Sequence, residues 1–309
     1  MPPLDAIDLT DLDRFANGFP HQLFTHLRRE RPVWFHAPTA HTPGGEGFWV
    51  LTRHADIVAA ASDAAGLSSH TGGQRDGGGT LIEDLPTGFA AGVLLNMMDD
   101  PRHRHIRRIA APALSPRTLR ELEDELRART AVILDAALAR GRCDFLIEIA
   151  AELPLQAIAK LLGIPQADRH QLFGWANATL DYDDRDLGAQ SEKAAAAGAA
   201  MFEYGGRLLA EKRRALADDM LSAVAHGQVP GADGALEPVS ELEQQMFFNL
   251  LVFAGSETTR NSIALGVLAL IEHPQQWAQL VDDRGALPGA VEEMLRWASS
   301  TPYNRRTAT

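Results

Sequence analysis

The sequence lacks the features that mark several classes of protein. It holds a single cysteine, Cys143, which excludes an internal disulfide and agrees with a reducing compartment. Lys and Arg total 29 against 41 Asp and Glu, and the net charge of -12 argues against general affinity for nucleic acid or an anionic membrane. The N-terminal stretch carries aspartates and no apolar core segment, so neither a signal peptide nor an anchor is indicated. We therefore expect a cytoplasmic protein.

No linker rich in Pro, Gly or Ser divides the chain cleanly. At 309 residues, 45% of them hydrophobic, it can bury a large core, so residues 1–309 are expected to form a single domain. Aromatic and β-branched residues from Phe48 to Thr52 predict a short strand. From Pro116 to about Met220 the pattern is helical, with breaks near Gly163–Pro165 and at Asp181–Gly188. The expected fold is mainly α with a minor β-sheet.

The longest helical pattern contains polar groups where few are expected. Ser240 and Glu243 form a capping box and Pro274 stops the pattern, which predicts a helix of roughly 30 residues. Apolar residues occupy nearly all of its faces, so little of it should face water. Inside it lies the run Ala254-Gly255-Ser256-Glu257-Thr258-Thr259. The glycine costs about 1 kcal/mol of helix propensity relative to alanine.

This run allows two interpretations. In the first, a kinked core helix carries Thr258 bonded to its own backbone and Glu257 at the surface. In the second, the run forms a groove against a flat ligand, with a proton-handling pair beside it. The segment alone does not decide between them. A membrane span is excluded because polar residues such as Asn249 and Arg260 interrupt the apolar run.

Positive side chains concentrate between Asp99 and Arg108, after acidic residues and a proline that indicate a helix start. His103 and Arg107 are four residues apart and share a helix face. Two aligned donors suit a carboxylate or a phosphate. The alternatives are a solvated basic face without a ligand, or a docking surface for an acidic partner.

Weaker signals lie near the end of the chain. Glu293 and Arg296 stand at i and i+3, a spacing typical of a surface ion pair. Arg306, in a strand-like stretch, is another possible anion donor. No spacing of His and Cys resembles a zinc site, so no metal is assigned to protein ligands.

Taken in order, the motifs resemble those of the bacterial cytochrome P-450 family. They are Asp99-Asp100-Pro101-Arg102-His103-Arg104-His105-Ile106-Arg107, Asp218-Asp219-Met220-Leu221-Ser222, Ala254 to Thr259, Glu293-x-x-Arg296 and Arg306-Thr307-Ala308. Each is modest, but together they cover essentially the whole chain in the right order. The run that begins at Ala254 looks most like actinobacterial members that oxidise steroids, branched lipids and terpenoids. The resemblance implies the P-450 fold and a haem-dependent monooxygenase.

The resemblance also implies roles for individual residues. Ala254 and Gly255 would let haem and dioxygen approach the long helix, where Glu257 and Thr258 would pass protons through water. The haem propionates would be held by His103, Arg107 and Arg306. Glu293 and Arg296 would form a structural ion pair. The substrate pocket would be lined by Leu250, Phe253, Pro302 and Tyr303, with the loop around Leu81 to Leu95.

The implied cofactor is haem b, and the implied partners are a hydrophobic small-molecule substrate, a ferredoxin that docks near the basic helix, and a ferredoxin reductase. In the family the iron is held by a cysteine in a Phe-x-x-Gly-x-x-x-Cys-x-Gly loop. These 309 residues contain no such loop, and Cys143 lacks its context. The resemblance therefore predicts a chain that is incomplete at its C-terminal end and inactive by itself.

A haem-free relative that binds or activates another enzyme is the alternative function. Such a partner has no physical need for Gly255, Glu257 and Thr258 or for the propionate donors. Their presence favours the monooxygenase.

Overall fold

The computed structural model describes residues 7–40, 42, 45–71, 77–82, 85–86, 88–179 and 191–309. Internal contacts divide the chain into two compact units. Unit 1 comprises the described residues of Met1–His103, Asp181–Ser191 and Asn304–Thr309, and unit 2 those of Arg104–Leu180 and Glu192–Tyr303. The single domain expected from the sequence stays a prediction.

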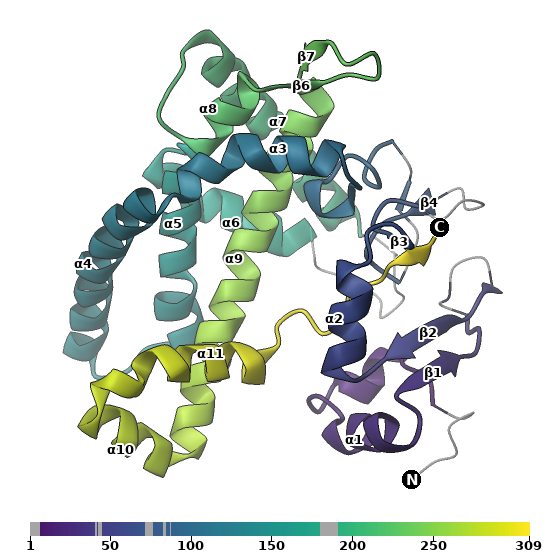
Figure 1. The fold of residues 1–309 in the computed structure, drawn as a ribbon. Helices are drawn as coiled ribbons and strands as arrows, with labels where there is room; N and C mark the ends of the chain where they lie inside the picture. The colour runs from purple at the N-terminus through teal and green to yellow at the C-terminus, as the bar shows by residue number, and fades with distance from the viewer. Residues whose placement is uncertain are drawn as a thin grey trace. The chain divides into compact units, whose positions relative to one another are not determined.

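Unit 1 is built from short elements. They are α1 (His21–Glu30), β1 (Val33–His36), β2 (Phe48–Leu51), α2 (His54–Ser62), β3 (Leu67–Ser68), β4 (Gly77–Gly78), β5 (Leu85–Pro86) and β8 (Thr307–Ala308). β1 pairs antiparallel with β2, as Figure 1 shows, so the strand expected from Phe48 is confirmed. Every second residue of β1 is buried, and Trp34 packs with Ile7, Leu23 and Leu27 in a small core.

Unit 2 is helical. Its helices are α3 (Arg102–Ala110, whose first two residues belong to unit 1), α4 (Pro116–Arg140), α5 (Glu152–Leu162), α6 (Arg169–Thr179), α7 (Glu192–Arg214), α8 (Met220–Ala225), α9 (Glu241–Glu272), α10 (Pro274–Asp282) and α11 (Leu287–Ala298). A hairpin of β6 (Gln228–Pro230) and β7 (Leu236–Pro238) precedes α9. The mainly α fold with minor β structure is confirmed. The break expected at Asp181–Gly188 lies outside the described residues.

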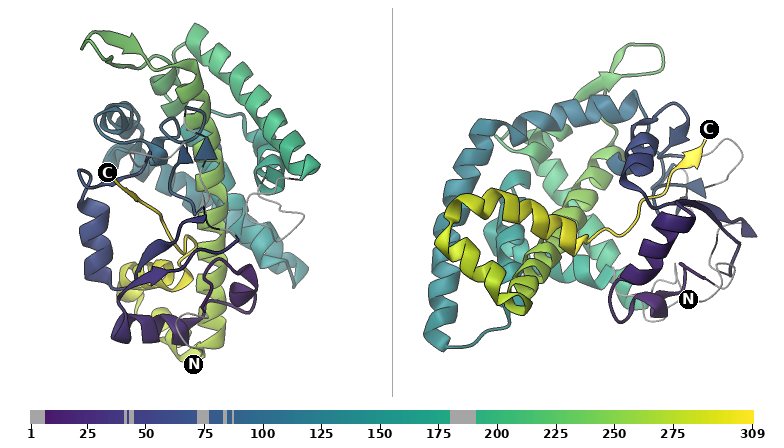
Figure 2. Two further views of the ribbon diagram at one scale, coloured as in Figure 1. Left: turned by 90° about the vertical axis from the view of Figure 1, so that its right-hand side faces the viewer. Right: turned by 60° about the horizontal axis from the view of Figure 1, so that its bottom comes forward.

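Helix α9 runs through unit 2 and contacts α5, α6, α7 and α11 (Figure 2). Its 32 residues begin after the capping box of Ser240 and Glu243, as the sequence predicts. The burial prediction is wrong for the C-terminal half, where Leu265, Leu268 and Ile271 are exposed. Within the described part of the chain, no helix is long and apolar enough to span a membrane.

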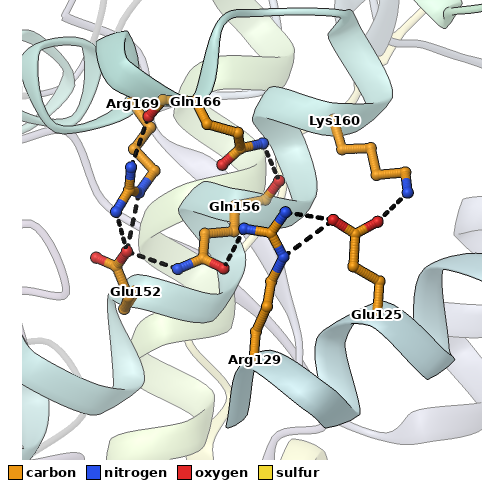
Figure 3. Close-up of polar contacts among 7 residues, drawn as sticks. All are labelled: Glu125, Arg129, Glu152, Gln156, Lys160, Gln166 and Arg169. Atoms are coloured by element: carbon orange, nitrogen blue, oxygen red, sulfur yellow. Dashed lines mark hydrogen bonds and ion pairs between the residues drawn. The ribbon is translucent and has the colours of Figure 1, made fainter. Parts of the chain in front are cut away.

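A chain of polar contacts fastens α4 to α5 (Figure 3). Glu125 of α4 accepts hydrogen bonds from Arg129 on its own helix and from Lys160 of α5. Arg129 also donates to Oε1 of Gln156 at 2.8 Å. Gln156 is a buried residue of α5, so its side-chain amide must be satisfied inside the protein.

The same chain of contacts continues to α6. Nε2 of Gln156 donates to Oε1 of Glu152 at 2.6 Å, and Nε of Arg169, the first residue of α6, donates to the same oxygen at 2.8 Å. Burial raises the pKa of Glu152, but the hydrogen bonds from Gln156 and Arg169 outweigh it and hold that pKa below its usual value. Glu152 therefore stays ionised and fixes the start of α6.

Candidate functional site

Arg306 is positioned in unit 1 by strand pairing. It directly precedes β8, which pairs antiparallel with β3 so that Thr307 lies opposite Ser68. Arg306 is half-buried, and one of its terminal nitrogens donates to the carbonyl of Arg305 at 2.8 Å. The other donors of a guanidinium are directed outward from the same plane, in the geometry that suits a carboxylate.

His103 is tied to the same strand pair through Asp99. The hydroxyl of Ser68 donates to Oδ2 of Asp99, and the amide of Ser69 donates to Oδ1 at 2.8 Å. The carbonyl of Asp99 accepts the His103 amide at 3.1 Å, which places His103 in the first turn of α3. Unit 1 thus brings together the backbone positions of Arg306 and His103, which are far apart in the sequence.

Arg107 lies one turn after His103 on α3, as the sequence predicts. It belongs to the part of the helix in unit 2. Its neighbours Arg104 and Arg108 are exposed, as is Arg107 itself. The helix therefore presents a basic surface on an otherwise acidic protein.

On α9, Thr258 forms the backbone bond of the first of the two interpretations given above. Its Oγ1 donates to the carbonyl of Ala254 at 2.7 Å, and Ala254 is exposed. The carboxylate of Glu257 is 37% exposed and lies 3.6 Å from a terminal nitrogen of Arg260. Ser256, to which the sequence analysis gave no role, is the buried hydroxyl of the run and donates to Val252 at 2.7 Å.

The lack of a side chain at Gly255 has a packing cause. A Cβ at this position would stand 2.9 Å from Cδ1 of Ile158, on α5. Real Cβ atoms essentially never approach another atom so closely, so a larger residue would displace the Ile158 side chain or the helix that carries it. Gly255 therefore permits close contact between these two helices. Its role toward haem stays a prediction.

The four residues expected to line a pocket are spread along unit 2. Leu250 and Phe253 are half-buried on α9, whereas Pro302 and Tyr303 are exposed after α11. The loop around Leu81 to Leu95 lies partly outside the described residues. A groove of about 610 Å³ lies elsewhere, along α4, and is lined by Leu119, Leu122, Glu123, Leu126, Arg127, Thr130, Ala131 and Leu134.

Glu293 and Arg296 form the ion pair that their spacing predicts. Two nitrogens of Arg296 donate to the two oxygens of Glu293, at 2.6 and 2.7 Å. The hydrogen bond lowers the pKa of Glu293 and raises that of Arg296. Both side chains are exposed, so the pair lies at the surface of α11.

No metal-binding cluster of three or more His, Cys, Asp or Glu occurs among the described residues. Cys143 is exposed. The sequence analysis gave no roles to Ser68 and His70, and it read Asp99 only as part of a helix start. The Ser68–Asp99 hydrogen bond joins segments about 30 residues apart, and no local sequence pattern predicts it.

Comparisons of the sequence and of the fold with known proteins point to one family. The chain is 48% identical over 307 residues to a protein of Mycobacterium tuberculosis named cytochrome P450 126, and the match covers 99% of the chain and 73% of that relative. It is 34% identical over 319 residues to the methyl-branched lipid omega-hydroxylase of the same species, covering 99% and 71%.

Among solved structures, a cytochrome P450 of Mycobacterium marinum in complex with pseudoionone superposes with a TM-score of 0.80 at 31% identity. The superposition covers 96% of this chain and 72% of that one. No family model matches the chain.

Proposed function

Because the chain belongs to the cytochrome P450 family of monooxygenases, we propose that it binds haem b and hydroxylates a hydrophobic small molecule such as a steroid, terpenoid or lipid. A relative named as a hydroxylase of methyl-branched lipids and a solved relative that holds pseudoionone support this substrate class. The mostly apolar residues Leu250, Phe253, Pro302 and Tyr303 would contact the substrate.

The observation that carries the proposal is the anchoring of Arg306 and His103 to one strand pair of unit 1. Ser68 lies opposite Thr307 in that pair and bonds to Asp99, whose carbonyl holds the His103 amide. The Arg306 guanidinium and the His103 imidazole, tethered in this way, would suit the carboxylates of the two haem propionates. Arg107 would add a third donor on α3.

Bound haem would supply the iron that activates dioxygen. The chain would supply protons from α9. The Thr258 hydroxyl donates its hydrogen to Ala254, so its oxygen is left to accept a hydrogen bond from water. Glu257 is 37% exposed and can exchange protons with solvent. Ala254 is exposed beside Thr258 and, together with Gly255, would face the haem.

Electrons would come from a ferredoxin, itself reduced by a ferredoxin reductase. The exposed guanidinium groups of Arg104, Arg107 and Arg108 form the basic surface of α3. Such a surface attracts an acidic partner and speeds its association, most strongly at low salt.

Titration of the purified chain with hemin, followed by absorbance, tests the proposal. We expect a saturable complex, weakened about tenfold in Arg306→Leu and in His103→Leu, because each loses a charge-assisted hydrogen bond. Arg31→Leu, in an exposed turn of unit 1, is the matched control and should bind as the unchanged chain does. Thr258→Ala, on α9, should also bind hemin as the unchanged chain does, because Thr258 is assigned to proton transfer and not to the propionates. Absence of saturable binding would favour the haem-free partner of another enzyme.

A further inference from the structure

His70 carries an imidazole nitrogen, Nε2, that is shielded from solvent and finds no hydrogen-bond partner among the described residues. Buried polar atoms in folded proteins are almost always hydrogen-bonded, so such an atom requires an explanation. We propose that Nε2 of His70 binds a carboxylate of the ligand that Arg306 and His103 hold. This inference rests on the proposed function, because it concerns the same anion site.

The backbone fixes His70 in place. Its amide donates to the Ser68 hydroxyl at 3.0 Å, and its carbonyl accepts the Gly79 amide at 2.8 Å. Ser68 Oγ is the same atom that donates to Asp99. The ring is therefore attached to a backbone that has little freedom to carry Nε2 toward solvent.

Gly92 lies directly against the ring. A Cβ at this position would stand 2.5 Å from Nε2 of His70, closer than any real contact. The Gly92 amide donates to the carbonyl of Met97 at 2.7 Å, and its φ of +81° favours glycine. The backbone of Gly92 thus packs against the imidazole, and a side chain at this position would displace the ring from where it lies.

The charges around this backbone select the ligand chemistry. His70 follows Ser68 by two residues, Ser68 lies opposite Thr307, and Thr307 follows Arg306. Asp99, bonded to Ser68, holds the amide of His103. Three nitrogen-bearing side chains therefore extend from one hydrogen-bonded group of backbone segments, and an N–H donor at Nε2 completes a site for an oxygen anion. The carboxylate can come from a haem propionate or from a fatty-acid substrate.

Nuclear magnetic resonance of the full chain, labelled with 13C-histidine, tests the proposal. The Cε1–Hε1 signal of His70 is assigned by its loss in His70→Gln. Zinc protoporphyrin IX and dodecanoate are the carboxylate probes, and zinc protoporphyrin dimethyl ester and dodecanol are their matched neutral counterparts. We expect the signal to shift with a carboxylate and not with its neutral counterpart. A response to the porphyrin acid identifies a propionate, and a response to dodecanoate identifies a fatty acid.

Affinity measurements separate binding from a structural role. His70→Phe should weaken the effective carboxylate probe about tenfold and leave its neutral counterpart unchanged. His70→Gln keeps a donor near the position of Nε2 and should therefore recover part of the lost affinity. It also keeps the test decisive if the phenylalanine variant does not fold. His54→Phe, at an exposed position of unit 1, should have no effect. Equal weakening of acid and neutral probes, or no shift with either acid, overturns the proposal. If neither porphyrin binds, the haem function fails while dodecanoate still decides the role of His70.

Discussion

Gly255 shows how the absence of a side chain can permit close contact between two helices. In an ordinary helix, alanine in place of glycine would add about 1 kcal/mol of stability. At Gly255 the added methyl would meet Ile158, and overpacking of this kind costs about 1–3 kcal/mol. We expect Gly255→Ala to lower the free energy of unfolding by about 1 kcal/mol, measured by urea denaturation.

The matched control for this substitution is Gly174, in α6, where a Cβ would meet nothing within 4 Å. Gly174→Ala should raise the free energy of unfolding by about 1 kcal/mol. Adding Ile158→Ala to Gly255→Ala should recover part of the loss, because the clashing atom is removed. A stabilising effect of Gly255→Ala alone would show that α5 and α9 have room between them.

For single residues, a hydrogen bond within one helical turn could be predicted from the sequence. Contacts between segments far apart in the sequence could not. The bond from Thr258 to Ala254 spans one helical turn, so the residue type alone offers it as one of the two interpretations. The contact of Gly255 with Ile158 and the position of His70 depend on segments far away in the sequence. No pattern of nearby residues announces them.

Among the elements, α4, α5 and α6 depend on Glu152. Its carboxylate accepts two hydrogen bonds from Arg169 and one from Gln156. Glu152→Gln removes the negative charge that pairs with the Arg169 guanidinium, whose side chain is 23% exposed. We expect a loss of about 2 kcal/mol of unfolding free energy at pH 7, measured by denaturation.

The pH dependence of this stability loss shows whether its cause is electrostatic. Since the pKa of Glu152 lies below its usual 4.5 in the folded chain, its contribution is present above that value and is lost as the pH falls through the folded pKa. The stability difference between the unchanged chain and Glu152→Gln should therefore be full at pH 7 and shrink below pH 4.5. Glu293→Gln breaks a similar two-bond pair at the exposed surface of α11 and should cause no measurable change. A difference that persists at low pH would contradict an electrostatic cause.

Element boundaries were predictable where the sequence itself carries the signals. The capping box and Pro274 bound α9 correctly because both act within one turn. The exposure of Leu265, Leu268 and Ile271 was not predictable, because an apolar residue shows that burial is favourable but not which element supplies the cover. The pairing of β3 with β8 was equally hidden, since each strand is only two residues long.

For the whole molecule, two features act in opposite directions on association between copies. They are the net charge of -12 and the apolar side chains exposed on unit 2. Leu134 and Leu138 share a face of α4 and are 38% and 75% exposed, and Leu134 also lines the groove along this helix. Apolar surface of this kind promotes association, whereas like charge keeps copies apart. Salt should decide between the two effects, because it screens charge over about 10 Å at 0.1 M and leaves apolar contacts intact.

We therefore expect self-association that increases with salt, measured by sedimentation velocity between 50 mM and 500 mM sodium chloride. Leu134→Lys combined with Leu138→Lys should reduce it at both salt concentrations, because two exposed apolar side chains of α4 are replaced by hydrated ones. Leu216→Lys is the control, since this residue is 73% exposed between α7 and α8 and lies outside the groove. Equal effects of the double variant and the control would mean that added charge, and not the apolar face of α4, governs association. A decrease of association with salt would instead show attraction between oppositely charged surfaces, such as the basic face of α3 and acidic residues of a second copy.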